Sequence, residues 1–396
     1  MNKELSEFSE KVMARRGVEL ITPFDMKVKT RALEKKGKSI IHLEIGEPDF
    51  DTPENIKKAG IVAIQEGYTH YAPSQGLPEL REAVASYISA TRQIDVSPDE
   101  VVITPGGKDV IFYSMMALLK SGDEVIVQNP GYYPYETDAK LFGADVVPLP
   151  LLEENDFSFG REQFKKLITP RTKLITIISP ANPTGNIFSQ EDLEVIAEEA
   201  IKNDIYVLSD EIYSRIVYEG EFRSIASIPG MKKRTIILDG FSKTYAMTGW
   251  RLGYSVSDKT IAKIFNKFLV SSNSCVAAFT QIAGIEALTG PQDAVEKMNA
   301  EYRKRKDLVA KGLNEINGIS CRMPEGAFYV FPNIKKFGVS SNEFALYLLD
   351  EAGVAVIPGS TFGETGEGYI RISYANSMDN LKEALNRIKK STEKIS

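Results

Sequence analysis

"TIILDGFSKTYAMTGWRLGY" (Thr235–Tyr254) is the stretch of sequence from which the fold can be read. It begins as an apolar, strand-like run. It then places a single lysine, Lys243, among small, hydroxyl and aromatic residues. An amine at the end of a core strand loses its hydration, which is costly for a charged group. The position of Lys243 therefore indicates that its amine has a chemical role.

Apolar runs of the same kind recur upstream of this stretch. They are Val101–Gly107, Asp123–Pro130, Ala144–Leu151, Lys173–Pro180 and Asp204–Glu211. Most are separated by helix-length segments, such as the one that begins at Ser189 and is typical of a capped amphipathic helix. Runs that are apolar on both faces and alternate with helices indicate an α/β fold with a covered parallel sheet.

After about Gly290 the pattern changes to a long charged helical stretch followed by short apolar runs. Near the end of the chain, Leu381, Leu385 and Ile388 lie on one face of a helix. This pattern predicts a smaller α+β unit. We expect a large domain over residues 46–290 and a small domain formed by residues 1–45 and 291–396.

The composition narrows the possible functions. The chain has 396 residues and a formal charge of −6, and no basic stripe that would bind a nucleic-acid backbone. No apolar run is long enough for a membrane span, and the first residues lack the apolar core of a signal peptide. Two cysteines make no disulfide framework, so we expect a cytoplasmic protein.

Histidine is scarce, with only His42 and His70 in the chain. A Ser-His-Asp site would have to use one of them, and no close-spaced ligands exist for a zinc site of the usual Cys/His kind. We therefore expect no metal, and chemistry from Lys, Asp, Tyr, Arg and Asn with the help of an organic cofactor.

Ligands of open α/β sheets bind beyond the carboxyl ends of the strands. Gly107 and Lys108 follow the first apolar run, where a glycine turn can present backbone N–H groups to an anion. Asn182 and Asp210 follow two later runs. The structural alternatives are a plain tight turn at Gly107 and Lys108, an Asx turn at Asn182 and a helix N-cap at Asp210. A P-loop NTPase is excluded, because the glycine required before the "GKS" at Gly37–Ser39 is missing.

Two arginines complete the candidate site. Arg251 lies eight residues after Lys243, and Arg371 lies inside the apolar run "YIRISYA". A guanidinium in such a place needs a carboxylate or phosphate partner. The alternative for Arg371 is an edge-strand arginine whose head reaches outward to water.

Six landmarks occur in order over nearly the whole chain. They are Gly46–Pro53, His70–Val84, Asn182–Gly185, Asp210–Tyr213, Ser242–Tyr254 and Arg371–Ala375. With them the chain resembles the class I aminotransferases, pyridoxal-phosphate enzymes of the aspartate aminotransferase fold (fold type I). The resemblance implies a large domain with a mostly parallel seven-stranded sheet between helices, plus a smaller α+β domain.

The resemblance also implies roles around the cofactor ring. Lys243 would hold the cofactor as a Schiff base and later move a proton. Asp210 would keep the pyridinium nitrogen protonated. Tyr213 and Asn182 would hydrogen-bond the phenolic oxygen, and Tyr132 would stack on the ring.

The remaining implied roles concern the phosphate and the substrate. The cofactor phosphate would be held by the Gly107 backbone, Ser242 and Arg251. A tyrosine matching Tyr71 reaches the phosphate of the other subunit in the family, which implies a homodimer with shared sites. The substrate α-carboxylate would be bound by Arg371, with help from the Gly46 backbone.

Lys108 bears on the substrate. In bacterial aspartate aminotransferases of the same subgroup, a matching lysine contacts the distal carboxylate. The sequence therefore favours transfer from aspartate to 2-oxoglutarate, although Lys108 could serve only the cofactor.

Several alternatives remain open. The chain could be an aromatic or alanine aminotransferase, or a C–S lyase, decarboxylase or cyclopropane-forming synthase of the same fold. A more remote alternative is a regulator that fuses this fold to a DNA-binding module. We expect no such module, because only about 45 residues precede Gly46.

Overall fold

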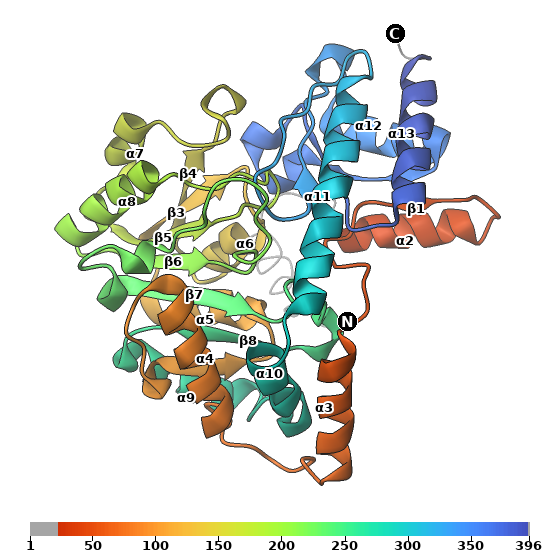
Figure 1. Cartoon of the computed structure of the whole chain (residues 1–396). Helices are drawn as coiled ribbons and strands as arrows, with labels where there is room; N and C mark the ends of the chain where they lie inside the picture. The colour runs from red at the N-terminus through yellow and green to blue at the C-terminus, as the bar shows by residue number, and fades with distance from the viewer. Residues whose placement is uncertain (1–22, 395–396) are drawn as a thin grey trace, which may run out of the picture.

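The computed structural model describes residues 23–394, and its centre is a seven-stranded sheet covered by helices (Figure 1). The sheet has the order β2-β8-β7-β6-β5-β3-β4. Neighbouring strands from β7 to β4 pair in parallel, whereas β8 is antiparallel to both β2 and β7. The strands are β2 (Val101–Thr104), β3 (Glu124–Asn129), β4 (Asp145–Pro150), β5 (Thr172–Ile178), β6 (Tyr206–Asp210), β7 (Thr235–Gly240) and β8 (Gly253–Val256). The prediction of a mostly parallel seven-stranded sheet is confirmed.

Twelve α-helices are present in residues 23–394. They are α2 (Pro23–Glu34), α3 (Glu54–Gln65), α4 (Pro78–Arg92), α5 (Gly107–Leu118), α6 (Pro134–Leu141), α7 (Arg161–Leu167), α8 (Gln190–Lys202), α9 (Lys259–Ser272), α10 (Ala278–Thr289), α11 (Asp293–Asn314), α12 (Ser341–Tyr347) and α13 (Met378–Thr392). The predicted cap of α8 is confirmed, because Ser189 Oγ accepts a hydrogen bond from the Asp192 N–H at 3.1 Å. None of these helices is long and apolar enough to cross a membrane.

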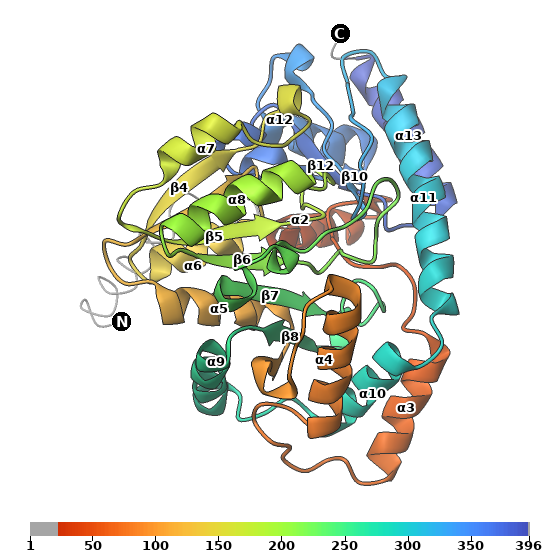
Figure 2. The same cartoon turned by 60° about the vertical axis from the view of Figure 1, so that its left-hand side comes forward.

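Alternating side chains of the strands explain why the sheet has helices on both faces. In β7, Ile236 and Leu238 pack with α5 and α9, whereas Ile237 faces the core formed with α4 and α10. Toward the other end of the sheet, α7 and α8 pack on the face opposite α6 (Figure 2). A sheet with two apolar faces needs a layer of helices on each face to remove both faces from contact with water.

Two strands differ from the pattern expected of the apolar runs. β4 is an edge strand, and only Leu149 in it is fully buried. β8 begins two residues after Arg251 and is not one of the apolar runs from which the sheet was predicted. It is only four residues long and starts at Gly253, whose Cα lies against the backbone of Gly106 with no room for a side chain.

The C-terminal part forms a smaller unit with its own sheet (Figure 1). Its antiparallel sheet has the order β11-β12-β9, and a separate parallel pair joins β1 to β10. These strands are β1 (Ile41–His42), β9 (Tyr329–Val330), β10 (Val354–Ala355), β11 (Ile357–Pro358) and β12 (Ile370–Ser373). In α13, Leu381 and Ile388 are buried and Leu385 is half-buried, as the helical pattern predicted.

We propose the division into domains 46–290 and 1–45 with 291–396 as it was read from the sequence. The pairing of β1 with β10 supports it, because that pairing attaches the chain before Gly46 to the C-terminal unit. The part of the N-terminal segment before Pro23 lies outside the described residues.

Candidate active site

The predicted site residues follow strands that end at one edge of the central sheet. Asp210 is the last residue of β6, and Lys243 follows the end of β7 by three residues. Asn182 lies four residues after β5, and Gly107 begins α5 after β2. Because β5, β6 and β7 are parallel, their carboxyl ends meet at that edge, where open sheets bind ligands.

The Lys243 amine is enclosed by backbone and an aromatic ring. Its Nζ donates a hydrogen bond of 2.6 Å to the Gly46 carbonyl and lies 5.9 Å from the centre of the Phe328 ring. Burial lowers the pKa of Lys243 to about 8. The charged side chains that act on this amine are Glu47, Asp210, Arg251 and Arg371. A larger share of the amine is therefore neutral and nucleophilic near pH 7 than for an ordinary lysine.

Asp210 is a buried carboxylate with two donors. The Tyr135 hydroxyl donates to Oδ2 at 2.8 Å, and the Ile212 N–H donates to Oδ1 at 3.1 Å. Burial raises the pKa of Asp210 to about 6, and the hydrogen bond from Tyr135 opposes that rise. This carboxylate gains from a cationic partner, as a protonated ring nitrogen would be.

Aromatic side chains form one wall of the site. The hydroxyls of Tyr213 and Tyr329 are 2.7 Å apart, and burial raises the pKa of Tyr213 well above its usual range. Burial also raises the pKa of Tyr132, on which the charges of Asp210 and Arg371 act. The ring centre of Tyr132 lies 6.3 Å from that of Tyr135, whose hydroxyl donates to Asp210.

Arg371 is a buried cation without a carboxylate partner among residues 23–394. Its side chain is 2% exposed in β12, the central strand of its sheet. Nη1 donates to Asn182 Oδ1 at 3.1 Å and Nη2 to the Glu44 carbonyl at 2.6 Å. Nε has no hydrogen-bond partner among the residues that the structure describes. The alternative of an edge arginine reaching into water is thus wrong, and the guanidinium is suited to a carboxylate ligand.

The start of α5 forms a turn in which only glycine fits. Gly106 has φ of +97°, and a Cβ there would lie 2.6 Å from Arg251 Nη2. Arg251 donates to the Pro105 and Thr248 carbonyls, both at 3.0 Å. No described side chain caps α5, so the N–H groups of its first turn can receive an anion beside Arg251.

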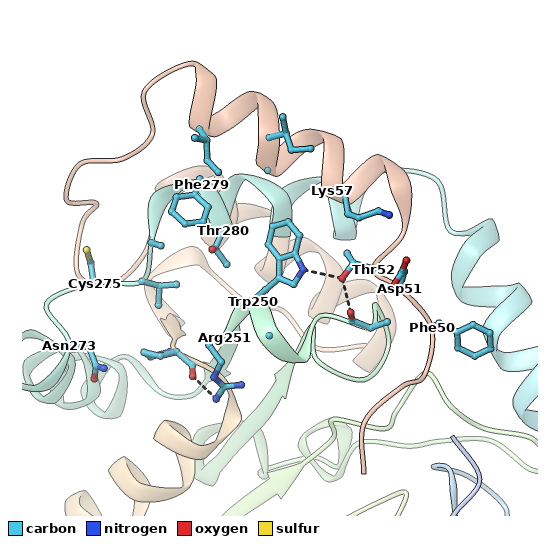
Figure 3. A pocket seen from close by; sticks show the side chains of 18 residues that line it. Phe50, Asp51, Thr52, Lys57, Trp250, Arg251, Asn273, Cys275, Phe279 and Thr280 are labelled. Carbon is cyan, nitrogen blue, oxygen red and sulfur yellow. Dashed lines mark hydrogen bonds between the residues drawn. The ribbon is translucent and has the colours of Figure 1, made fainter. Parts of the chain in front are cut away.

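A cavity of about 880 Å³ lies beside this turn, between α3 and α10 (Figure 3). Trp250 projects toward it, and its Nε1 donates to Thr52 Oγ1 at 3.0 Å. Thr52 Oγ1 in turn donates to the Ala246 carbonyl at 2.7 Å. Arg251 lines the cavity, whereas Lys243 and Asp210 do not. The cavity therefore adjoins the strand-end site without containing it.

Three predicted site residues are more exposed than the buried side chains of the site. Ser242 is half-buried beside Lys243, and Lys108 is exposed in the first turn of α5. Tyr71 is 90% exposed in the segment between α3 and α4. Within a single chain, Tyr71 is not part of the enclosed site.

Two site residues were missed in the sequence. Tyr135 is the third tyrosine of "NPGYYPY" (Asn129–Tyr135), in which only Tyr132 was predicted to take part in the site. Tyr329 lies in "GAFYVFPNI", one of the short apolar runs after Gly290, and no role in the site was predicted for it. Their hydroxyls inside otherwise apolar segments were the available signal, because a buried hydroxyl needs a partner.

Comparisons with known proteins agree with this geometry. A family model described as "Aminotransferase class I and II" matches residues 38–388. An aspartate aminotransferase of Pyrococcus abyssi is 44% identical, over 89% of this chain and 92% of its own. Aromatic-amino-acid aminotransferase 2 of Thermococcus litoralis is 42% identical, over 94% and 96%. The solved structure of the Thermus thermophilus aspartate aminotransferase with maleate matches with a TM-score of 0.90 at 38% identity, over 93% and 96%.

Proposed function

The chain belongs to the class I and II aminotransferases and is a pyridoxal-phosphate-dependent enzyme, and we propose that it moves the amino group of aspartate to 2-oxoglutarate. The observation that carries the site assignment is the buried guanidinium of Arg371. It has no carboxylate partner among the described residues, and its charge acts on the Lys243 amine.

The residues present fit the cofactor. The glycine turn at Gly106 and Gly107, with Arg251 beside it, has the chemistry of a phosphate site, to which we add Ser242. The depressed pKa of Lys243 suits covalent attachment of an aldehyde, and Asp210 suits a protonated ring nitrogen. We assign Tyr213, Asn182 and Tyr132 to the same ring, as the family resemblance implies.

The cofactor, when bound, supplies an electron sink for the electrons left at the substrate Cα. Asp210 contributes a fixed negative charge that favours the protonated ring nitrogen. With the cofactor bound, Lys243 Nζ would be the group that takes the proton from the substrate Cα and holds it for return. Its amine can do both at neutral pH, because a pKa of about 8 lies close to the working pH.

Arg371 binds the α-carboxylate of the substrate and thereby orients the Cα–H bond toward Lys243. The guanidinium is held on two sides, by Asn182 of the large domain and the Glu44 carbonyl. Its free Nε is a donor for the incoming carboxylate. The Gly46 backbone, which lies against Lys243, is expected to contribute to the same pocket.

The choice of aspartate depends on Lys108. This lysine follows Gly107 in the first turn of α5 and carries the positive charge that a distal carboxylate requires. A second candidate is an aromatic donor. The rings of Tyr329 and Phe362 lie 4.6 and 5.0 Å from the Arg371 guanidinium carbon, and such rings could also pack against an aromatic substrate.

The active assembly is proposed to be a homodimer in which Tyr71 completes the partner's phosphate site. The 90% exposure of Tyr71 supports this, as do the exposed apolar side chains of Ile61, Val62 and Ile64 on α3. Cys275 and Cys321 are both free thiols, which supports a reducing, cytoplasmic setting.

A half-reaction screen tests the proposed function. The purified protein with bound cofactor is mixed with single amino acids, and the absorbance change of the cofactor is followed with no oxo acid present. Aspartate is expected to react fastest, and 2-oxoglutarate is expected to restore the starting spectrum. A faster reaction with phenylalanine or tyrosine would favour the aromatic candidate. Product released well beyond one equivalent per site without an oxo acid, with the starting spectrum retained, would favour a lyase or decarboxylase.

A further inference from the structure

A buried arginine lies behind the strand ends that carry the site. Arg92, in the last turn of α4, is 4% exposed. Its Nε donates to Glu211 Oε2 at 2.6 Å, and its Nη2 donates to Asp239 Oδ2 at 2.9 Å and Ser214 Oγ at 2.7 Å. Nη1 donates to Thr91 Oγ1 at 2.9 Å. Each nitrogen of this guanidinium therefore has a partner, whereas the Nε of Arg371 has none among the described residues.

The two carboxylates are adjacent in sequence to the residues that would hold the cofactor. Glu211 directly follows Asp210, and Asp239 precedes Lys243 by four residues. The Glu211 N–H donates to the Leu238 carbonyl at 2.8 Å, so the ends of β6 and β7 are also joined by backbone. Arg92 thus connects the ends of two neighbouring strands through Glu211 and Asp239.

The charges behind the site need this arginine. Glu211 is fully buried and accepts hydrogen bonds from Ser209 and Ser224 in addition to Arg92. Burial raises the pKa of Asp239 to about 7, and the guanidinium of Arg92 opposes that rise. The carboxylates of Glu211 and Asp210 act on Asp239 in the direction of a higher pKa. Without Arg92, neighbouring buried carboxylates would face one another with less compensation.

We propose that Arg92 is a positioning residue: it joins the ends of β6 and β7 and so fixes the spacing of Asp210 and Lys243. The inference rests on the proposed roles of those two residues in cofactor binding. Groups that bind a rigid ring at two points must be held at the right separation, and that separation depends on the residues behind them.

The first test compares Arg92→Met with Arg92→Lys. Cofactor affinity is measured by equilibrium dialysis, and the melting temperature of the cofactor-free protein is measured alongside. Arg92→Met is expected to weaken cofactor binding about tenfold or more, by analogy with the partners that orient metal ligands. Arg92→Lys is expected to restore part of the affinity, because it keeps the charge but loses the planar fork.

A matched control separates positioning from general stability. Lys306 of α11 is another buried cation, and its Nζ lies 2.8 Å from Glu219 Oε1. Lys306→Met is expected to lower the melting temperature and leave the cofactor affinity unchanged. If Lys306→Met weakens cofactor binding as much as Arg92→Met does, the effect is one of stability and the proposal is wrong.

A double variant keeps the test decisive if Arg92→Met does not fold. Arg92→Met combined with Asp239→Asn removes one positive and one negative charge, so the net charge behind the site is unchanged. The folded double variant is still expected to bind the cofactor more weakly, because the link between β6 and β7 is lost. Wild-type affinity in this variant would overturn the proposal.

The outcome is distinguishable from a failure of the proposed function. If the wild-type protein binds the cofactor but transfers no amino group in the half-reaction screen, the proposed function fails. The affinity comparison among the Arg92 and Lys306 variants then still decides whether Arg92 positions the cofactor site.

Discussion

Arg371 Nη1 donates a hydrogen bond of 3.1 Å to Asn182 Oδ1, so a strand of the small unit and a loop of the central sheet meet at one pair of atoms. The two residues are far apart in the sequence. Asn182 follows β5 of the central sheet, and Arg371 lies within β12 of the small unit. We therefore expect the substrate carboxylate, bound by Arg371, and the cofactor ring, bound by Asn182, to lie next to each other.

The first prediction concerns this arginine and its missing partner. A non-reactive dicarboxylate such as succinate should raise the melting temperature of the protein, because it binds the folded state only. The linked stabilisation is about 2.7 kcal/mol at a ligand concentration of about 100 times Kd. Arg371→Lys should reduce the shift, since a lysine cannot bind a carboxylate at two points. Succinamide serves as the uncharged control, and an equal shift with it would contradict the assignment.

The second prediction follows from the enclosed amine of Lys243. Only the neutral amine attacks an aldehyde, so attachment of added cofactor to the cofactor-free protein should accelerate as the pH rises through about 8. Stopped-flow absorbance measures that rate. An ordinary lysine would give a midpoint near 10.4. After borohydride reduction, mass spectrometry should find the cofactor on wild-type protein and not on Lys243→Ala. The same adduct on the variant would show that another lysine carries it.

The third prediction concerns the buried carboxylate of Asp210. Asp210→Ala should lower kcat by roughly a hundredfold or more, a barrier increase of about 3 kcal/mol, because a preorganised charge is lost. Tyr135→Phe removes only the hydrogen bond to this carboxylate and should have a smaller effect in the same direction. Near-normal turnover of Asp210→Ala, measured at saturating cofactor, would be incompatible with the proposed role.

The fourth prediction separates the two substrate candidates. Lys108→Ala should lower kcat/KM for aspartate about ten- to hundredfold, the usual cost of a lost charge-assisted hydrogen bond. The values for alanine and phenylalanine should change much less, because they have no distal carboxylate. Equal losses for all three donors would assign Lys108 to the cofactor alone.

The fifth prediction concerns pH and stability at the start of the small unit. His42 Nδ1 lies 2.8 Å from Glu44 Oε1 and Nε2 lies 3.0 Å from Glu34 Oε1. The hydrogen bond to Glu44 is the largest cause that raises the pKa of His42; with the hydrogen bond to Glu34 and the charges of both carboxylates it outweighs partial burial, and the pKa rises from 6.5 to about 9. A raised pKa in the folded state stabilises the protein fully below pH 6.5, and this contribution is lost as the pH rises through about 9.

Denaturant unfolding of His42→Gln and wild type at pH 6 and pH 10 measures this effect. The difference in unfolding free energy should be larger at pH 6 than at pH 10. His70→Gln, at an exposed position, serves as the control and should change little at either pH. A difference for His42→Gln that does not vary with pH would contradict the assigned ion pairs.

The sequence predicted those features that leave a short-range pattern, namely the ends of strands and the buried faces of helices. The strand-end positions of Asn182, Asp210 and Lys243 followed from apolar runs that end in polar residues, and the sheet order places them together. The long helix α11 and the buried face of α13 followed from periodicity. The roles within the site came from the resemblance and stay predictions.

Other features have no local signal. β8 is short and starts at a glycine, so its place between β2 and β7 depends on pairing with distant strands. Arg92 reads as an ordinary charged residue near the end of an amphipathic helix, and only the fold brings it to Glu211 and Asp239. Likewise, the hydroxyl of Tyr329 meets Tyr213 across 116 residues of sequence. Such contacts are set by tertiary structure and leave no periodicity to detect.

The indole of Trp250 has a practical consequence. It is the chain's only tryptophan, and it lies beside Arg251, with its Nε1 bonded to Thr52 and its ring against Gly60 of α3. All tryptophan fluorescence of the protein therefore originates next to the proposed phosphate site and the proposed subunit contact. Emission intensity should fall when the cofactor binds, and the emission maximum should move to longer wavelength if dilution separates the subunits. The unmodified chain thus carries its own optical probe for both events.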